Sequence, residues 1–209
     1  MKGWIGSVTT TRTPGRSIYL DAFYIDKHEV TNALYRRFME ATGRGAPEYW
    51  NNNNHNTPNQ PVVGVSRHDA EAYCKWAVKR LPTKAEWEKA ARGTDGRTYP
   101  WGEQWDSSRA NSAESKLGRA APVGSYPNGV SPYGVHDMAG NVWEWVADWY
   151  DENYYQRSPD RNPKGLDSGQ LCVLRGGSWL SIVWNLRASS SNRTFPTGRN
   201  FITGFRCAQ

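Results

Sequence analysis

The spacing of hydrophobic and polar residues changes along the chain, and the first pattern has a period of two residues. In the stretch SIYLDAFYIDKHEVT, residues 17–31, apolar and polar positions alternate and place Ile18, Leu20, Ala22 and Tyr24 on one face. A period of two residues is typical of β-strands. This stretch therefore predicts one or two short strands.

A helical pattern follows the predicted strands. Thr31 is placed as an N-cap, and Leu34, Tyr35 and Phe38 recur at helical spacing after it. Gly43 stands where a helix would end, because glycine adopts the left-handed backbone conformation that commonly closes a helix. We expect a helix between Thr31 and Gly43.

Two further helices are predicted, each by a capping signature in which Ser or Thr is followed three residues later by an acid. Ser66 with Asp69 begins the first, and Thr83 with Glu86 begins the second. The predicted inner faces consist of Ala70, Tyr73, Cys74 and Ala77 in the first helix, and of Trp87, Ala90 and Ala91 in the second. Gly93 stands at the end of the second helix.

Residues 94–174 lose the helical pattern and are dense in Gly, Pro, Asn, Asp and aromatic residues. One strand-like piece, NVWEWVADWY, alternates Val142, Glu144, Val146 and Asp148 with Trp143, Trp145 and Ala147. Short strands, two or three helices and a long irregular half predict an α+β fold. Nothing marks a hinge, so residues 1–209 are expected to form one domain.

The composition is polar for a folded protein but rich in large rings. Only 37% of the residues are hydrophobic, yet there are 11 Trp, 11 Tyr and 5 Phe, and a buried ring removes roughly 150–250 Å² from water. Aromatic residues should therefore supply much of the core. No apolar run approaches the roughly 20 residues that span a bilayer. The N-terminus lacks the apolar region of a signal peptide, so we expect no membrane span and a cytoplasmic location unless another export route operates.

Positive charge is concentrated near the C-terminus. The chain has 26 Lys and Arg against 20 Asp and Glu, but residues 175–209 contain five arginines and neither an acid nor a lysine. Such a segment is compatible with binding of nucleic acid or another anion. Five charges over this length make only a weak patch, so we favour arginines that hydrogen-bond to backbone carbonyls. Nucleic acid is not expected as a partner.

Cysteine and histidine spacings do not predict a metal site. Cys74, Cys172 and Cys207 are too few and too scattered for a structural zinc site, and at most one pair can form a disulfide. The four histidines show no ligand motif.

Seven separated motifs carry a resemblance to a known family. They are RLPTKAEWEKAARG, TYPWGEQW, RANS, APVGSYPNG, YGVHDMAGNVWEWVADWY, VLRGGSW and GFRC, in this order. The chain resembles the formylglycine-generating enzyme (sulfatase-modifying factor) domain from about residue 17 to the end. The resemblance implies a C-type lectin fold, loop-rich with short antiparallel strands. It also implies that Cys74 and Cys207 lie close together and pair, which leaves Cys172 as a buried thiol.

The family's oxidases bind copper through two cysteines that follow the GGS[WY] motif. The matching positions here are Ser181 and Leu186. Soft Cu(I) needs sulfur ligands, which serine and leucine do not provide. We therefore expect neither copper nor the family's catalysis. An enzyme of this family with altered chemistry is the alternative.

A calcium site of the family resembles the stretch DMAGNVWE. The resemblance implies side-chain ligands at Asp137 and Glu144 and carbonyl ligands at Gly140 and Val142. Two carboxylates plus carbonyl oxygens suit Ca²⁺. The alternative is that both carboxylates only hydrogen-bond to the turn.

The segment of residues 175–209, called the C-terminal segment below, combines a family frame with unusual residues between the frame positions. Many non-catalytic relatives have asparagines there, whereas this chain has apolar, hydroxyl and aromatic residues. This pattern resembles the variable proteins of diversity-generating retroelements, in which error-prone copying at adenines changes AAC codons. Changes in the first two bases of AAC reach Leu, Ser, Ile, Thr, Phe and Val but not Trp, so Trp184 needs another template triplet.

The resemblance implies a ligand-binding protein whose C-terminal segment is the variable region, with a protein or other macromolecule as partner. The expected contact residues are Leu180, Ser181, Ile182, Val183, Trp184, Ser190, Ser191, Thr194, Phe195, Phe201 and Ile202. Apolar and aromatic anchors among small polar groups are typical of a recognition surface. In the alternative, Leu180, Ile182 and Trp184 form the inner face of a strand.

Overall fold

The computed structural model describes residues 2–5 and 17–209 and shows an α+β arrangement around a small central sheet. The strands of this sheet follow the order β5 (Ser191–Thr194), β4 (Cys172–Arg175), β3 (Trp143–Trp149) and β6 (Thr203–Phe205). β4 is antiparallel to β3 and β5, and β6 is parallel to β3. A second, two-stranded antiparallel sheet pairs β1 (Lys2–Ile5) with β2 (Phe23–Asp26).

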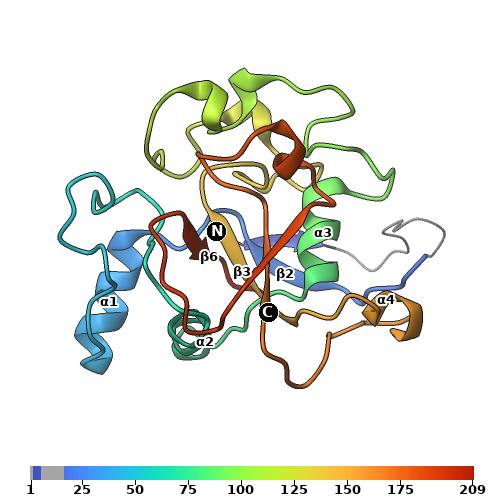
Figure 1. The fold of residues 1–209 in the computed structure, drawn as a ribbon, viewed down its shortest axis with the longest axis horizontal. Helices are drawn as coiled ribbons and strands as arrows, with labels where there is room; N and C mark the ends of the chain where they lie inside the picture. Colours follow the sequence, from blue (N-terminus) through green and yellow to red (C-terminus); the bar gives the residue numbers. More distant parts are fainter. Residues whose placement is uncertain (1, 6–16) are drawn as a thin grey trace.

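The helices surround the central sheet (Figure 1). They are α1 (Asn32–Thr42), α2 (Arg67–Trp76), α3 (Lys84–Arg92) and the short α4 (Tyr154–Arg157). The loops carry the 3₁₀ turns η1 (Ser107–Arg109), η2 (Ala113–Ser115), η3 (Pro127–Gly129) and η4 (Val183–Leu186). Long loops between α3 and β3 gather with η4 at one end of the molecule, at the top of Figure 1. None of the helices in the described ranges is long and apolar enough to cross a membrane.

The three predicted helices are confirmed, together with their caps. The Thr31 hydroxyl accepts a hydrogen bond from the Leu34 N–H, and Gly43 ends α1 in the left-handed conformation. Ser66 and Thr83 both form complete capping boxes. One inward position is wrong: Leu34 is exposed, because the buried face of α1 runs through Tyr35 and Phe38.

The predicted face of the first strand is also wrong in part. Ile18 and Leu20 are buried, but Ala22 and Tyr24 are exposed. The physical reason is that the chain is irregular from residue 17 to residue 22 and becomes a strand only at Phe23. The alternation restarts there and buries Phe23 and Ile25.

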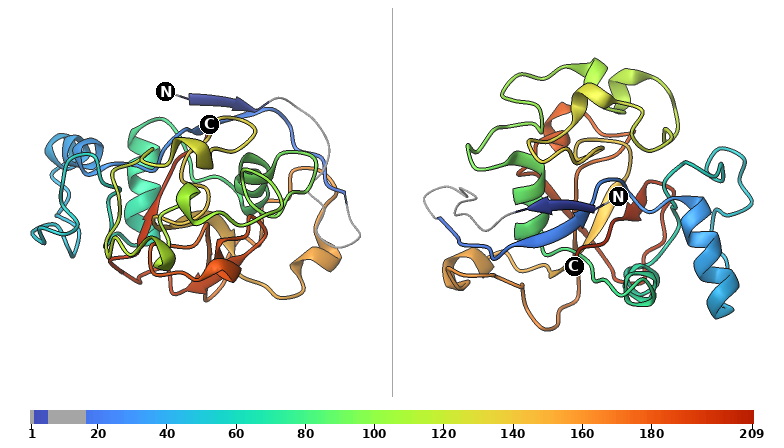
Figure 2. Two further views of the ribbon diagram at one scale, coloured as in Figure 1. Left: turned by 90° about the horizontal axis from the view of Figure 1, so that it is seen from above. Right: turned by 180° about the vertical axis from the view of Figure 1, so that it is seen from behind.

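The central sheet is covered on both faces, so β3 is buried on both sides. Its alternation is as predicted. Trp143 and Trp145 pack with the aromatic residues of α1 and α2 and with Phe205. Val146 points the other way, into a second cluster that contains Trp87 of α3. Figure 2 shows the same layers from above and from behind.

Asp148 of β3 ties α3 to the sheet and makes folding depend on pH. Its Oδ2 accepts a hydrogen bond of 2.6 Å from the Lys84 N–H at the start of α3. Burial raises the pKa of Asp148 from 3.8 to about 6, against the lowering effect of that hydrogen bond. The stability that Asp148 contributes is therefore fully present below pH 3.8 and is lost as the pH rises through about 6.

The variant Asp148→Asn removes this titration while keeping an oxygen for the Lys84 N–H. Between pH 4.5 and pH 7.5 we expect its free energy of unfolding to rise relative to wild type by about 2 kcal/mol. Urea denaturation at both pH values measures this, with Asp167→Asn, at an exposed position, as control. Parallel pH profiles for wild type and Asp148→Asn would contradict the assignment.

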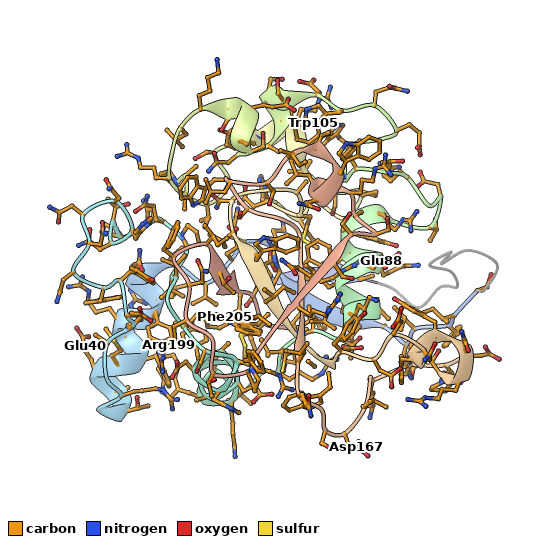
Figure 3. All side chains as sticks on the ribbon, in the orientation of Figure 1. Glu40, Glu88, Trp105, Asp167, Arg199 and Phe205 are labelled. Carbon is orange, nitrogen blue, oxygen red and sulfur yellow. A yellow bond between two sulfur atoms is a disulfide. The ribbon has the colours of Figure 1, made fainter. Side chains whose placement is uncertain are left out.

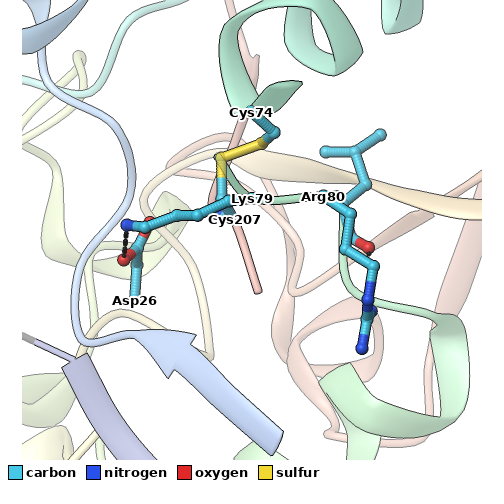
Figure 4. The surroundings of a disulfide bond; sticks show 6 residues. Asp26, Cys74, Lys79, Arg80 and Cys207 are labelled. Atoms are coloured by element: carbon cyan, nitrogen blue, oxygen red, sulfur yellow. Dashed lines mark hydrogen bonds and ion pairs between the residues drawn. A yellow bond between two sulfur atoms is a disulfide. The ribbon is translucent and has the colours of Figure 1, made fainter. Parts of the chain in front are cut away.

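A disulfide joins α2 to the end of the chain, as the resemblance implied. Cys74 and Cys207 are bonded, and their Cα atoms lie 5.7 Å apart. In Figure 4 the bond lies between the side chains of Lys79 and Arg80, and Lys79 pairs with Asp26. Cys172 is a free, buried thiol, and burial raises its pKa to about 11.

Candidate ligand-binding surface

The C-terminal segment begins with a buried turn. Gly176 and Gly177 have φ values of 91° and 79°, a region that side-chain-bearing residues rarely adopt. A Cβ on Gly177 would also lie 2.6 Å from Leu186 Cδ2. The Gly140 N–H donates to the Gly176 carbonyl, and the Trp179 N–H donates to the Asn141 carbonyl. The DMAGN loop therefore holds this turn from behind.

Two buried arginines hold the segment at its ends. Arg175 donates to the carbonyls of Ala188, Ser189 and Ser190 and forms a 2.8 Å ion pair with Glu88. Arg206 binds both oxygens of Glu144. These two arginines act on backbone and buried carboxylates, as expected. Arg199 also donates to a backbone carbonyl, that of Gly64, and pairs with Asp69. The other two differ, because Arg187 lies over the Trp184 ring and Arg193 lies over the Tyr150 ring.

Four large apolar side chains of the segment are exposed. Their exposed fractions are 49% for Leu180, 57% for Ile182, 61% for Trp184 and 64% for Phe195. Leu180, Ile182 and Trp184 come from η4 and the turn before it, and we call these three residues the η4 patch. The Arg187 guanidinium lies 4.2 Å from the Trp184 ring centroid. Exposed apolar groups that lie together normally mark a contact surface.

The alternative of a strand with an inner apolar face is wrong. Residues 180–186 form a turn and the 3₁₀ helix η4, and the three side chains of the η4 patch point outward. Ser181 also needs correction as a contact residue, because it is buried. Its Oγ accepts a hydrogen bond from the Ser178 N–H, and its carbonyl accepts one from the Ala113 N–H. Ser181 thus holds the loop rather than facing a ligand.

The remaining predicted contact residues differ in exposure and position. Ser191 is exposed, and five others are half-buried: Val183, Ser190, Thr194, Phe201 and Ile202. The Ser190 hydroxyl donates to the Trp184 carbonyl and so belongs to the η4 region. Phe195 lies beyond β5, where the Arg67 N–H of α2 donates to the next residue, Pro196. The structure thus separates Phe195 from the η4 patch.

Phe201 and Ile202 form part of a packed edge. The Phe201 ring contacts those of Tyr49, His55 and Trp179. Ile202 packs against the cluster beneath β3, and its carbonyl accepts from the Trp143 N–H. Replacement at these two positions would disturb packing more than replacement in the η4 patch.

A group of three aromatic residues lies beside η4 and was not among the contact residues expected from the sequence. Tyr99 stacks on Trp101, and the tilted ring of Trp105 contacts both. The two tryptophans and Val183 all pack against a buried cluster that contains Tyr99 and Leu186. Trp105 lies among the loops at the top of Figure 3. Residues 101–107 and Arg109 line a shallow hollow of about 650 Å³. The aromatic spacing in TYPWGEQW was the available signal.

The residues of the predicted calcium site lie together, but both carboxylates already accept hydrogen bonds from other groups of the protein. Glu144 accepts hydrogen bonds from the Arg206 guanidinium and from Trp87 Nε1. Asp137 Oδ2 accepts one from the Gly124 N–H. Among residues 2–5 and 17–209 no group of three or more His, Cys, Asp or Glu could hold a metal ion. Because Arg206 binds both oxygens of Glu144, the carboxylates present fit an ion pair better than Ca²⁺. Calcium at Asp137, Gly140, Val142 and Glu144 stays a prediction.

Beneath the surface, a third buried carboxylate joins Asp137 and Glu144. Glu29 accepts hydrogen bonds from Asn141 Nδ2, and the Asn141 amide oxygen accepts from Asn111 Nδ2 and the Ala121 N–H. Burial, reinforced by the charges of Asp137 and Glu144, raises the pKa of Glu29 well above its usual range. Burial likewise raises the pKa of Asp137. This network braces the DMAGN loop that supports the turn at Gly176.

Comparison with known proteins gives one family for nearly the whole chain. The model of the sulfatase-modifying factor enzyme 1-like domain matches residues 3–209. A formylglycine-generating enzyme of Streptomyces coelicolor is 37% identical, over 94% of this chain and 81% of that protein. The serine/threonine-protein kinase pkn1 of Chlamydia caviae is 38% identical, over 94% of this chain but only 34% of the kinase. This chain thus spans about a third of that kinase.

Solved structures confirm the fold. Treponema denticola variable protein 1 superposes with a TM-score of 0.82 at 23% identity, covering 99% of this chain and 94% of that one. This likeness shows the fold alone. The expected C-type lectin fold in its formylglycine-generating-enzyme form is therefore confirmed.

Proposed function

The chain belongs to the family of the sulfatase-modifying factor enzyme 1-like domain, and from that premise we propose that it is a non-catalytic ligand-binding protein. Its binding surface is carried by the C-terminal segment and centred on the η4 patch. The side chains there are diversified by a retroelement, and the partner is a protein or another macromolecule.

The observation that carries the proposal is that the large apolar infill residues of the C-terminal segment are exposed, while most of the frame positions are buried. The buried frame positions are Arg175, Gly176, Gly177, Ser178, Leu186, Gly204, Phe205 and Arg206. Leu180, Ile182, Trp184 and Phe195, which replace the relatives' asparagines, are exposed. A scaffold that accepts many different side chains at its binding surface must derive its stability from other residues. In this segment the buried frame residues can provide that stability.

The absence of catalysis is supported at the positions that match the oxidases' cysteines. Ser181 and Leu186 stand there, both are buried, and Leu186 packs with Tyr99. The remaining cysteines are the Cys74–Cys207 disulfide and buried Cys172. The alternative is an enzyme with altered chemistry, because a relative named formylglycine-generating enzyme is 37% identical. Stoichiometric copper with oxygen uptake by the copper-loaded protein would establish the enzyme instead.

A macromolecular partner is favoured by the character of the surface. The η4 patch is apolar and exposed, and the Arg187 guanidinium lies over its tryptophan. The rings of Trp101 and Trp105 pack against the same buried cluster as Val183 of η4. Aromatic and arginine side chains dominate the energetics of protein interfaces. A protein surface with an apolar hollow and carboxylates at its edge is the partner that this chemistry fits.

Tolerance to substitution tests the proposal without a known ligand. We expect the quadruple variant Leu180→Asn, Ile182→Asn, Trp184→Asn, Phe195→Asn to keep a free energy of unfolding within about 1 kcal/mol of wild type, since exposed side chains contribute little. The control Leu186→Asn, in the same segment but fully buried, should lose about 3 kcal/mol or more. Urea denaturation measures both. Equal losses in the two variants would show that the infill is structural.

The genomic locus tests the diversification itself. We expect a near-copy of the coding sequence for residues 175–209, differing mainly at adenines and lying beside a reverse transcriptase gene. A locus with neither feature would refute the retroelement.

A further inference from the structure

A second concavity lies outside the C-terminal loops. It is a cleft of about 690 Å³ between the start of β2, the last turn of α2, the link from α2 to α3, and the loop at residues 162–164. This volume lies within the range of small-molecule sites, about 300–1,000 Å³. Of residues 175–209, only Gln209 lines it. The cleft is thus distinct from the η4 patch.

The inner surface of the cleft is apolar. Its lining includes Leu20, Phe23, Leu81, Ala147 and Pro163. All of these except Ala147 are buried, so they form a floor beneath the open part of the cleft. The Lys79 N–H of the lining donates to the carbonyl of Cys74, which is bonded to Cys207. Such a floor favours the burial of a hydrocarbon or aromatic group.

The rim of the cleft carries charges, and all of its acids are already paired. Asp21 pairs with Arg161, Glu71 with Arg67, and Glu86 with Arg80. Lys79 is paired with Asp26. The two other lysines of the rim, Lys75 and Lys164, have no ion-pair partner among the described residues.

An apolar floor below two unpaired ammonium groups defines the chemistry of an occupant. A neutral apolar molecule would leave both charges without a partner, and a small hydrophilic anion would leave the floor empty. We propose that this cleft binds an amphipathic carboxylate, with an apolar body on Leu20, Phe23 and Leu81 and a single anionic head between Lys75 and Lys164. This site is independent of the ligand-binding surface proposed above.

Isothermal titration calorimetry of the full chain with octanoate tests the site. The octanoate concentration is kept below the concentration at which octanoate forms micelles. We expect saturable binding at one site, and none with octan-1-ol or acetate, which lack the anionic head and the apolar body respectively. The variant Lys75→Gln, Lys164→Gln changes only exposed side chains and should weaken octanoate binding about tenfold, as expected for the loss of two exposed ion pairs. Ala147→Leu, which fills the floor, should abolish binding.

Two controls separate this site from the η4 patch and from nonspecific adsorption. Ile182→Asn, Trp184→Asn should bind octanoate as wild type does, and Lys27→Gln, a lysine outside the cleft lining, should leave the affinity unchanged. Absence of saturable binding would overturn the proposal. So would equal affinity in wild type and the Lys75→Gln, Lys164→Gln variant, or loss of binding only when the η4 patch is changed. The first two of these results would leave the proposed function untouched, and the third would move the octanoate site to the η4 patch.

Discussion

Replacing Arg206 with methionine is expected to cost about 3–5 kcal/mol of folding free energy, the largest loss among the substitutions considered. Arg206 and Glu144 are both fully buried, and their ion pair has a 2.7 Å contact. Glu29 and Asp137 add two more buried carboxylates, whose charges act on Arg206. Methionine fills a similar volume but leaves this carboxylate cluster without its cation. Urea denaturation at pH 7 measures the loss.

Two further measurements test the cause of that loss. In the Arg206→Met background, Glu144→Gln should recover part of the stability, because it removes one uncompensated buried charge. The loss should also be smaller at pH 5 than at pH 8. Arg206 lowers the pKa values of Glu29 and Asp137, so its removal raises them further. The folded variant therefore neutralises its carboxylates by binding protons at pH 5, whereas at pH 8 more of them stay charged without a cation. A loss independent of pH, with no recovery by Glu144→Gln, would assign the effect to packing alone.

Breaking the Cys74–Cys207 bond is expected to have the second-largest effect. The bond closes a loop with a sequence separation of 133 residues. The chain-entropy model gives about 5 kcal/mol for a loop of this length, while measured losses in natural proteins are about 2–5 kcal/mol. Both cysteines are buried, so Cys74→Ala, Cys207→Ala avoids leaving an unpaired thiol in the core. We expect a loss of about 3 kcal/mol or more in urea denaturation.

The matched control for the disulfide is Cys172→Ala, which removes a buried thiol that forms no bond. It should cost about 1 kcal/mol through lost packing. Wild type in reducing buffer should also behave as the double variant does, whereas Cys172→Ala should respond to reductant as wild type does. Equal stability of oxidised and reduced wild type would show that the bond contributes nothing.

The helices were predictable because their signals act over a few residues. The capping boxes at Ser66 and Thr83 join groups three residues apart, and the burial of Trp87, Ala90 and Ala91 follows from helical spacing alone. The alternation in β3 was predictable for the same reason. The face of residues 18–24 was not, because the strand begins only at Phe23, where pairing with β1 begins.

The candidate surface was predictable only in part. The exposure of Ile182 and Trp184 followed from a contrast between frame and infill within one segment. The burial of Ser181 did not, because it depends on the Ala113 N–H, which approaches from a loop 68 positions away in the chain. The separation of Phe195 from the η4 patch was not predictable either. Phe195 follows the strand β5 and lies next to α2, and this placement depends on distant segments of the chain.

By itself, the sequence determined the capped helices, the alternation of the central strand, the missing sulfur ligands at Ser181 and Leu186, and the apolar character of the η4 patch. Only the tertiary structure decided that Glu144 forms an ion pair with Arg206, that Phe195 lies apart from Trp184, and that Lys75 and Lys164 border one cleft. The physical reason is range. Hydrogen-bond caps and side-chain periodicity act between near neighbours in the chain, whereas burial and charge pairing depend on which distant segments the fold brings together.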